Sequence, residues 1–222
     1  MKLWEEFRPR GYADVVGQDK AKRLLSLLRR RGLGGRALLL TGPSGTGKTT
    51  IAQILARELA DPLYVQELDA GLLDAAQIAE WEHDSHYGAP APGGRVYIVN
   101  EAHALKPTVV AQLLVSLERI PAHAVWIFTS VIRPERDSGE TRFFRTPSED
   151  TEPWLSRCDH LPLTSQGLAK PGAVRLLAIA RAADLVNGHT EEAMLKRLER
   201  LIHDSHGNLR AALSEIEKGY LL

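Results

Sequence analysis

The chain has 222 residues and a mass of 24.5 kDa, enough for one large domain with its own core and a smaller one. Its 28 Lys and Arg balance 28 Asp and Glu, so no bulk positive field points to a nucleic-acid partner. The single cysteine, Cys158, excludes a disulfide within the chain, and no apolar run reaches the roughly 18 residues of a membrane span. With a charged N-terminus, these features predict a soluble, cytoplasmic protein with no membrane contact.

The first two thirds of the chain alternate short apolar runs with helical patterns. We expect helices at 18–31, 48–59 and 107–119, and strands at 37–41, 63–68, 95–99 and 125–129. This alternation predicts parallel β-α-β units, with helices on both faces of one sheet. Residues 133–153 are polar and rich in Pro, Ser, Asp and Glu, which predicts a loop without regular structure.

From about residue 165 only helical signals remain. Three segments fit helices, at 170–186, 191–205 and 207–219. The change of pattern predicts a domain boundary near Leu163, with an α/β domain at residues 1–163 and a helical domain at residues 164–222.

The segment after the first expected strand reads GPSGTGKT and matches the pattern G-x-x-x-x-G-K-[ST] in full. It also lies between a strand and a helix, which is the context that this phosphate-binding loop requires. Backbone N–H groups and the helix N-terminus favour phosphate, Lys48 is placed for the β- and γ-phosphates, and Thr49 for Mg²⁺. The predicted nucleotide-binding residues are Gly42, Pro43, Ser44, Gly45, Thr46, Gly47, Lys48, Thr49 and Thr50.

The strand at 95–99 runs into Asn100 and Glu101, where a phosphate-loop ATPase needs acidic side chains. Glu101 is the candidate to polarise the attacking water. The residue before it is normally an Asp that helps to hold the hydration shell of Mg²⁺, and Asn100 contributes an oxygen but no negative charge. We expect ATP or ADP as ligand, Mg²⁺ held through Thr49 and Asn100, and slow hydrolysis. The alternative is an ordinary strand end in a fold without turnover.

Six segments resemble, in chain order, the AAA+ ATPases of the DNA sliding-clamp-loader clade, such as the bacterial gamma/tau subunit and replication factor C subunits. They are the N-terminal box from Trp4 to Gln18, the phosphate loop, ELDA at 67–70, NEAH at 100–103, LSRC at 155–158 and GNLRAAL at 207–213. The resemblance implies an α/β fold of the P-loop NTPase (AAA+) type. A parallel sheet would be sandwiched by helices and followed by a small three-helix lid.

The resemblance also implies roles for single residues. Val15 and Val16 belong to the box that packs on adenine. Arg157 would be an arginine finger that reaches the nucleotide of a neighbouring subunit, which demands an oligomer. Arg210 would be the sensor 2 residue that contacts phosphate in cis, and Thr129 falls at sensor 1. Taken alone, Arg157 fits a solvated loop arginine better than a finger, and the companion motifs reverse this; the alternative for Arg210 is an arginine on a solvated helix face.

Several features depart from the clade. Asn100 replaces the metal-site Asp, and a single cysteine excludes a cysteine-ligated zinc insert. The polar stretch at 133–153 lengthens the connection to the predicted finger. The sequence also ends after the lid, where clamp-loader subunits continue into a helical collar.

The resemblance implies a subunit of a homo- or hetero-oligomeric DNA-replication machine, a pentamer or hexamer. ATP state would be coupled to primer–template DNA or to a sliding clamp. Lys106 and Arg119 flank the helix that lines the DNA channel in related loaders, and are either phosphate contacts or exposed cations. Two alternatives remain open: a low-turnover scaffold that lends Arg157 to an active partner, and an AAA+ helicase loader, initiator or mobile-element accessory ATPase.

A second cluster, His83, Asp84, His86 and Tyr87, offers side chains that bind metals. The set is incomplete for zinc, so we expect a solvated helix end followed by a loop at 88–94.

Overall fold

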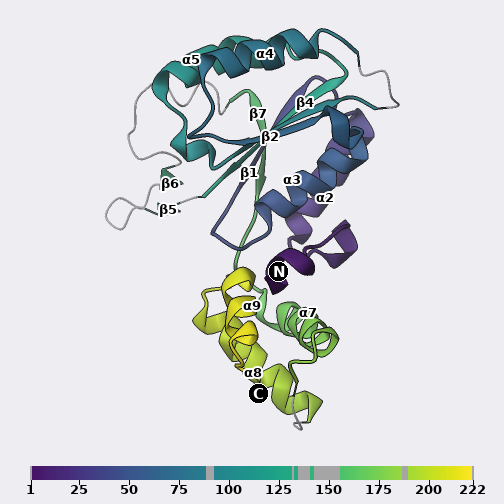
Figure 1. Cartoon of the computed structure of the whole chain (residues 1–222), viewed down its shortest axis with the longest axis vertical. Helices are drawn as coiled ribbons and strands as arrows, with labels where there is room; N and C mark the ends of the chain where they lie inside the picture. The colour runs from purple at the N-terminus through teal and green to yellow at the C-terminus, as the bar shows by residue number, and fades with distance from the viewer. Residues whose placement is uncertain are drawn as a thin grey trace.

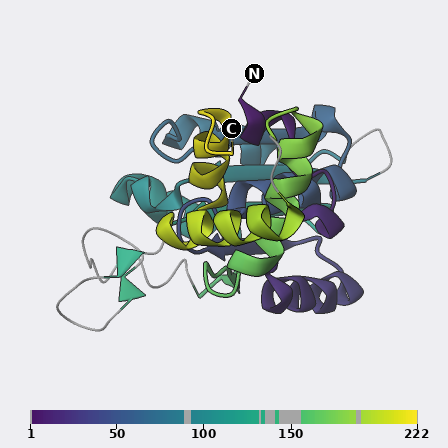
Figure 2. The same ribbon diagram turned by 90° about the horizontal axis from the view of Figure 1, so that it is seen from below.

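The computed structural model describes residues 2–88, 93–131, 133–134, 141–142, 156–186 and 190–221. Figure 1 shows a β-sheet flanked by helices, with a bundle of helices below it. Figure 2, viewed from below, places this bundle in front of the sheet. We call the strands with their flanking helices the sheet module, and the bundle formed by α7, α8 and α9 the lid.

Five strands form one parallel sheet in the order β2-β3-β4-β1-β7. Their bounds are β1 (Arg36–Thr41), β2 (Val65–Asp69), β3 (Arg95–Asn100), β4 (Ala124–Ser130) and β7 (Cys158–Pro162). The three central strands are buried along almost their whole length, as a sheet covered on both faces requires. The parallel α/β fold expected from the sequence is therefore confirmed, with β7 as an additional strand.

The sequence analysis missed β7 because its residues, CDHLP, contain no apolar run. Within the part of the chain that the structure describes, it is an edge strand paired with β1, so backbone hydrogen bonding rather than full burial defines it.

Two layers of helices cover the sheet. Helices α2 (Asp19–Arg31) and α3 (Lys48–Leu59) lie on one face, and α4 (Ala75–Ser85) and α5 (Pro107–Leu117) lie on the other (Figure 1). Each layer closes its own apolar core against the sheet. The core under α4 and α5 is aromatic: Trp126 packs 5.0 Å from Tyr97 and 5.5 Å from Trp81 between ring centroids.

The remaining short elements are α1 (Leu3–Glu6), η1 (Tyr12–Asp14), η2 (Pro62–Tyr64), η3 (Ala102–Ala104), β5 (Arg133–Pro134) and β6 (Thr141–Arg142). The prediction of a stretch without regular structure at 133–153 is wrong for β5 and β6, which pair as antiparallel strands. Such a pair needs only backbone donors and acceptors, which a polar composition does not remove. The other residues of that stretch lie outside the described residues.

The lid consists of α7 (Ala169–Ala182), α8 (Glu191–Asp204) and α9 (Leu209–Glu217), so the expected three helices are present. Side chains of Thr190 and Asn208 accept hydrogen bonds from backbone N–H groups at the first turns of α8 and α9. The lid core also includes Leu3, and the Leu3 N–H donates to Glu217 at 3.3 Å. The N-terminal helix therefore packs on the lid rather than on the sheet.

Gln18 links three parts of the chain. Its side-chain amide donates to the carbonyl of Thr164 at 2.8 Å and to that of Thr46 at 3.4 Å, and accepts from the Thr164 N–H at 3.0 Å. The residue is 5% exposed and adopts a left-handed backbone with φ of +61°. One buried amide thereby joins the N-terminal segment, the phosphate loop and the segment that leads to the lid.

We expect Gln18→Ala to lower the free energy of unfolding by about 1–3 kcal/mol, because it leaves buried backbone groups without partners. Thermal melts of the nucleotide-free protein measure this effect. Gln112→Ala is the matched control, since it removes one surface hydrogen bond from a helix where alanine is favoured. Equal melting temperatures for the two variants would contradict the linking role of Gln18.

Candidate nucleotide-binding and catalytic site

The phosphate loop joins β1 to α3 at the carboxyl edge of the sheet. Lys48 folds back over it, and its ammonium donates to the carbonyls of Gly42 and Pro43 at 3.0 and 2.9 Å. The Thr46 hydroxyl donates to the same Pro43 carbonyl at 2.8 Å. Gly45 and Gly47 have φ values of +75° and +97°, which side-chain-bearing residues rarely adopt. The loop is thus held in shape by its own contacts.

Lys48 is only 6% exposed, and burial lowers the pKa of its ammonium. The charge of Arg210 lowers this pKa further, and the carboxylate of Glu101 acts against the shift. Two cations therefore meet in the site with one nearby carboxylate. An anionic polyphosphate would relieve this imbalance.

Asn100 is the hydrogen-bonding centre of the site. Its side-chain oxygen accepts from the hydroxyls of Thr49 at 3.2 Å and Thr129 at 3.0 Å. Its NH₂ group donates to Glu67 on the neighbouring strand at 2.6 Å. The sequence analysis placed Thr49 and Asn100 together as metal-site candidates, and these two side chains are in direct contact. Glu67 had been noted only as part of a strand.

Glu101 follows directly and sits in a left-handed conformation with φ of +53°. Its N–H donates to the Thr129 hydroxyl at 3.4 Å, so the sensor 1 candidate supports the backbone of the catalytic candidate. Its carboxylate lies 3.3 Å from Nδ1 of His103. The side chain is 49% exposed, which leaves it open to the pocket that it lines.

This pocket has a volume of about 990 Å³, including its open mouth, and lies between the phosphate loop, the N-terminal box and the lid. Most of the predicted nucleotide-binding residues line it: Val15, Val16, Ser44, Gly45, Thr46, Gly47, Lys48, Thr49, Thr50 and Arg210. Gly42 and Pro43 do not line it and instead supply the carbonyls that hold Lys48. Its lining combines the glycine-rich loop and cations, which suit phosphates, with apolar side chains such as Val15 and Val16, which suit a base.

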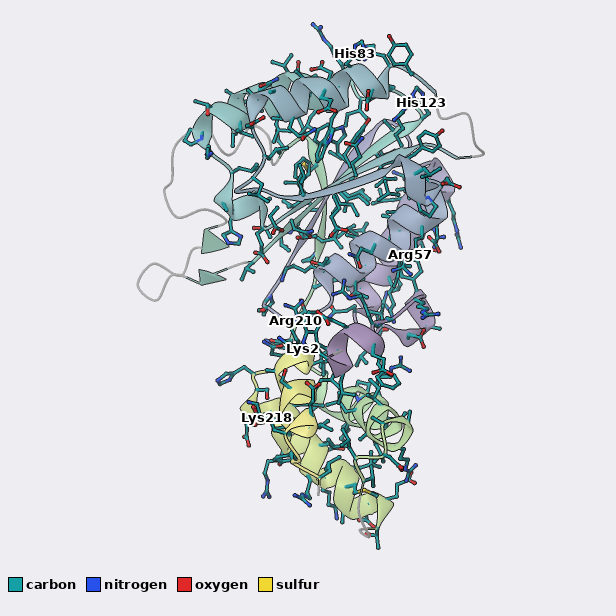
Figure 3. All side chains as sticks on the ribbon, in the orientation of Figure 1. Lys2, Arg57, His83, His123, Arg210 and Lys218 are labelled. Carbon is teal, nitrogen blue, oxygen red and sulfur yellow. The ribbon has the colours of Figure 1, made fainter. Side chains whose placement is uncertain are left out.

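Arg210 enters this pocket from the lid, where the lid meets the sheet module (Figure 3). Its guanidinium lies 4.8 Å from the ring centroid of Trp4, and that of Arg8 lies 5.6 Å from the same ring. The sequence analysis did not foresee that Trp4 would hold the sensor 2 candidate. Only the packing of α1 on the lid brings them together.

The lid also touches the phosphate loop directly. A Cβ atom added at Gly45 would lie 1.8 Å from Oδ1 of Asn208, the residue that caps α9. Farther along the pocket, Arg175 on α7 lies 3.6 Å from Asp14. The phosphate loop and the lid are therefore in contact at Gly45, with no room there for a side chain.

Arg157 lies away from this pocket. It precedes β7 and makes an ion pair with Glu118, and its Nε–H donates to the same carboxylate at 3.2 Å. Cys158 pairs with Ala37 at the beginning of β1, whereas the phosphate loop follows the other end of that strand. Six residues of strand separate the two ends by roughly 20 Å. Arg157 therefore does not reach the phosphate loop of its own chain.

The oxygen atoms of Thr49 and Asn100 are ligands that suit Mg²⁺, a hard cation. Among the described residues, no three His, Cys, Asp or Glu side chains gather as a metal site. This fits Mg²⁺ held largely by phosphate oxygens and water, as is usual for nucleotide enzymes. Elsewhere, His83 packs edge-on against Tyr87, and Nδ1 of His86 lies 2.7 Å from the Glu82 carbonyl.

The two residues proposed as DNA contacts, Lys106 and Arg119, are exposed at the two ends of α5. Leu155 of the predicted finger motif lies outside the described residues. No helix in the described part of the chain is long and apolar enough to cross a bilayer.

Several known proteins are similar to this chain. The family described as the TIP49 P-loop domain matches residues 5–82. The DNA polymerase III subunit gamma/tau of Mycobacterium tuberculosis is 34% identical over 161 residues, 61% of this chain and 28% of that protein. The gamma/tau subunit of Mycoplasma pneumoniae is 26% identical over 255 residues, 98% of this chain and 35% of that protein.

Solved structures of RuvB variants from Thermotoga maritima share the fold. One of them has a TM-score of 0.70 at 21% identity, and the aligned region covers 96% of this chain and 65% of the RuvB chain. The DNA polymerase III subunit tau of Salmonella typhimurium is 31% identical over 209 residues, 82% of this chain and 32% of that protein. The chain is a clamp-loader-like AAA+ protein. It spans only 28% to 35% of these curated relatives, so the activity and partners of those whole proteins are proposals for this AAA+ chain.

A nucleotide that draws Arg210 toward its phosphates should remove a cation from the Trp4 ring. We therefore expect added ADP or ATP to change the tryptophan fluorescence of this AAA+ protein. The change should be lost in Trp4→Phe, and the affinity measured with a labelled nucleotide should stay within a few-fold, as expected for an aromatic replacement. An unchanged fluorescence response in Trp4→Phe would show that Trp4 does not report on Arg210.

Proposed function

We propose that this AAA+ protein binds and hydrolyses ATP as one subunit of an oligomeric DNA-replication machine. In that role it would couple ATP state to DNA or to a sliding clamp. The main support is that the phosphate loop, Glu101 and the lid residue Arg210 line one and the same pocket. Similarity to DNA polymerase III gamma/tau subunits supports the replication setting.

In this proposal, each side chain has a defined task. Lys48 and the loop N–H groups bind the phosphates, and Glu101 polarises the attacking water while Thr129 holds its backbone. Thr49 and Asn100 would hold Mg²⁺, which would supply positive charge beside the phosphates when bound. Arg210 senses the phosphates from the lid, and its departure from Trp4 would change the lid angle.

Arg157 would act on a neighbouring subunit. Within its own chain it lies across the sheet from the phosphate loop and is paired with Glu118. A cation that stabilises the transition state must stand at the phosphates, so its target would be the pocket of an adjacent copy or a related subunit. Assembly would replace Glu118 by nucleotide as its partner.

Two other functions have observations in their favour. Asn100 supports a low-turnover scaffold subunit that binds nucleotide and lends Arg157 to an active partner. The fold likeness to RuvB supports an AAA+ protein of another branch, such as a helicase loader, initiator or mobile-element accessory ATPase.

Mixing of inactive variants tests the finger and the enzyme together. We expect Arg157→Ala and Glu101→Gln each to lower ATP turnover by about 10²-fold or more, with binding retained. If Arg157 acts in trans, an equimolar mixture should regain part of the activity, because some interfaces then combine an intact Glu101 with an intact finger. Turnover of the parent should rise more than linearly with protein concentration.

Arg30→Ala, at the exposed end of α2, is the matched control and should leave turnover unchanged. Failure of the mixture to regain activity, with each variant still oligomeric, would exclude a trans finger. ATP binding without turnover in any assembly would favour the scaffold.

DNA contact gives a separate prediction. We expect primed DNA to stimulate turnover, with a stimulation that falls as salt is raised, because phosphate contacts release counterions. Lys106→Ala combined with Arg119→Ala should weaken DNA binding and leave turnover without DNA unchanged. Stimulation that is equal in this variant would place the DNA contact elsewhere, and no stimulation by any DNA would favour the scaffold.

A further inference from the structure

Glu67 has no role in the proposed function, yet it makes the shortest contact to Asn100, 2.6 Å from its amide nitrogen. It lies on β2, beside β3, and its side chain is exposed. We propose that Glu67 is a positioning residue that orients the Asn100 amide and supplies the negative charge that an Asp would otherwise bring. This inference rests on the proposed function of the nucleotide site.

The hydrogen bond to Glu67 sets the orientation of the Asn100 amide. A carboxylate accepts only, so Glu67 must face the NH₂ side of the Asn100 amide. The hydroxyls of Thr49 and Thr129 can donate or accept, and so leave the amide free to turn over. Glu67 therefore decides that the oxygen of Asn100, rather than its NH₂ group, points to Thr49 and the metal side.

Glu67 is itself held in place. The amide NH₂ of Gln53, on α3, lies 3.3 and 3.0 Å from its two oxygens. Gln53 in turn accepts from Arg8 at 2.8 Å. Contacts thus run from the N-terminal box through α3 and β2 to Asn100, so the carboxylate is braced rather than free.

The charge of the site depends on the residues at positions 67 and 100 together. Glu67 and Asn100 together carry one negative charge, the same as a lone metal-site Asp. Asn100→Asp would put two carboxylates at hydrogen-bond distance, and since carboxylates only accept, neither could hold the other in place. An Asp at position 100 therefore does not strengthen this site by itself, and the residues at 67 and 100 have to change together.

A double-mutant cycle tests the inference with binding rather than turnover. The proteins are the parent, Glu67→Gln, Asn100→Asp and the two changes combined. For each, the affinity for labelled ADP is measured with excess Mg²⁺ and in EDTA, and the ratio of the two affinities is the readout. Glu80→Gln, which alters an exposed carboxylate on α4, is the control and should leave the ratio unchanged.

We expect Glu67→Gln to reduce this Mg²⁺ advantage by about tenfold, a typical cost of losing an outer-shell partner, with affinity in EDTA unchanged. Asn100→Asp alone should not improve it. The combined variant should restore it, because the amide introduced at position 67 can donate to the new carboxylate at position 100. Independent, additive effects of the two changes, or an unaltered ratio in Glu67→Gln, would overturn the role of Glu67. Absence of ADP binding by the parent would instead overturn the proposed function.

Discussion

The parallel pairing of the strands is the constraint on which the rest of this structure depends. Parallel strands need crossovers, so every strand ends at the same edge of the sheet. The phosphate loop follows β1, Asn100 ends β3, and Thr129 lies near the end of β4. Side chains far apart in the sequence therefore come within hydrogen-bond distance at this edge.

The same constraint separates the two arginines. Arg210 arrives at the carboxyl edge because the chain leaves β7 there and enters the lid. Arg157 stands where β7 begins, at the amino edge. One cation therefore lines the pocket of its own chain, and the other lies at the opposite edge of the sheet, paired with Glu118.

The electrostatics of the site are unbalanced in a way that suits its proposed ligand. Burial and Arg210 both lower the pKa of Lys48, so the pocket holds this cation at a cost. Negative charge is displaced one strand outward, to Glu67, while the position beside Thr49 is a neutral amide. The lid meets this arrangement at Trp4 through Arg210 and at Gly45 through Asn208.

The sequence by itself determined the fold class, the phosphate loop and the identity of most pocket residues. Apolar runs and glycine spacing are local signals, and they mark β1, β3, β4 and the loop between β1 and α3. Strand β7, with its polar composition, carried no such signal. Three contacts become visible only in the tertiary structure. They are the hydrogen bond from Asn100 to Glu67, the cation–π contact of Arg210 with Trp4, and the ion pair of Arg157 with Glu118. Each of these contacts joins residues that are far apart in the sequence. They depend on strand order and on the packing of the lid, which no local sequence pattern shows.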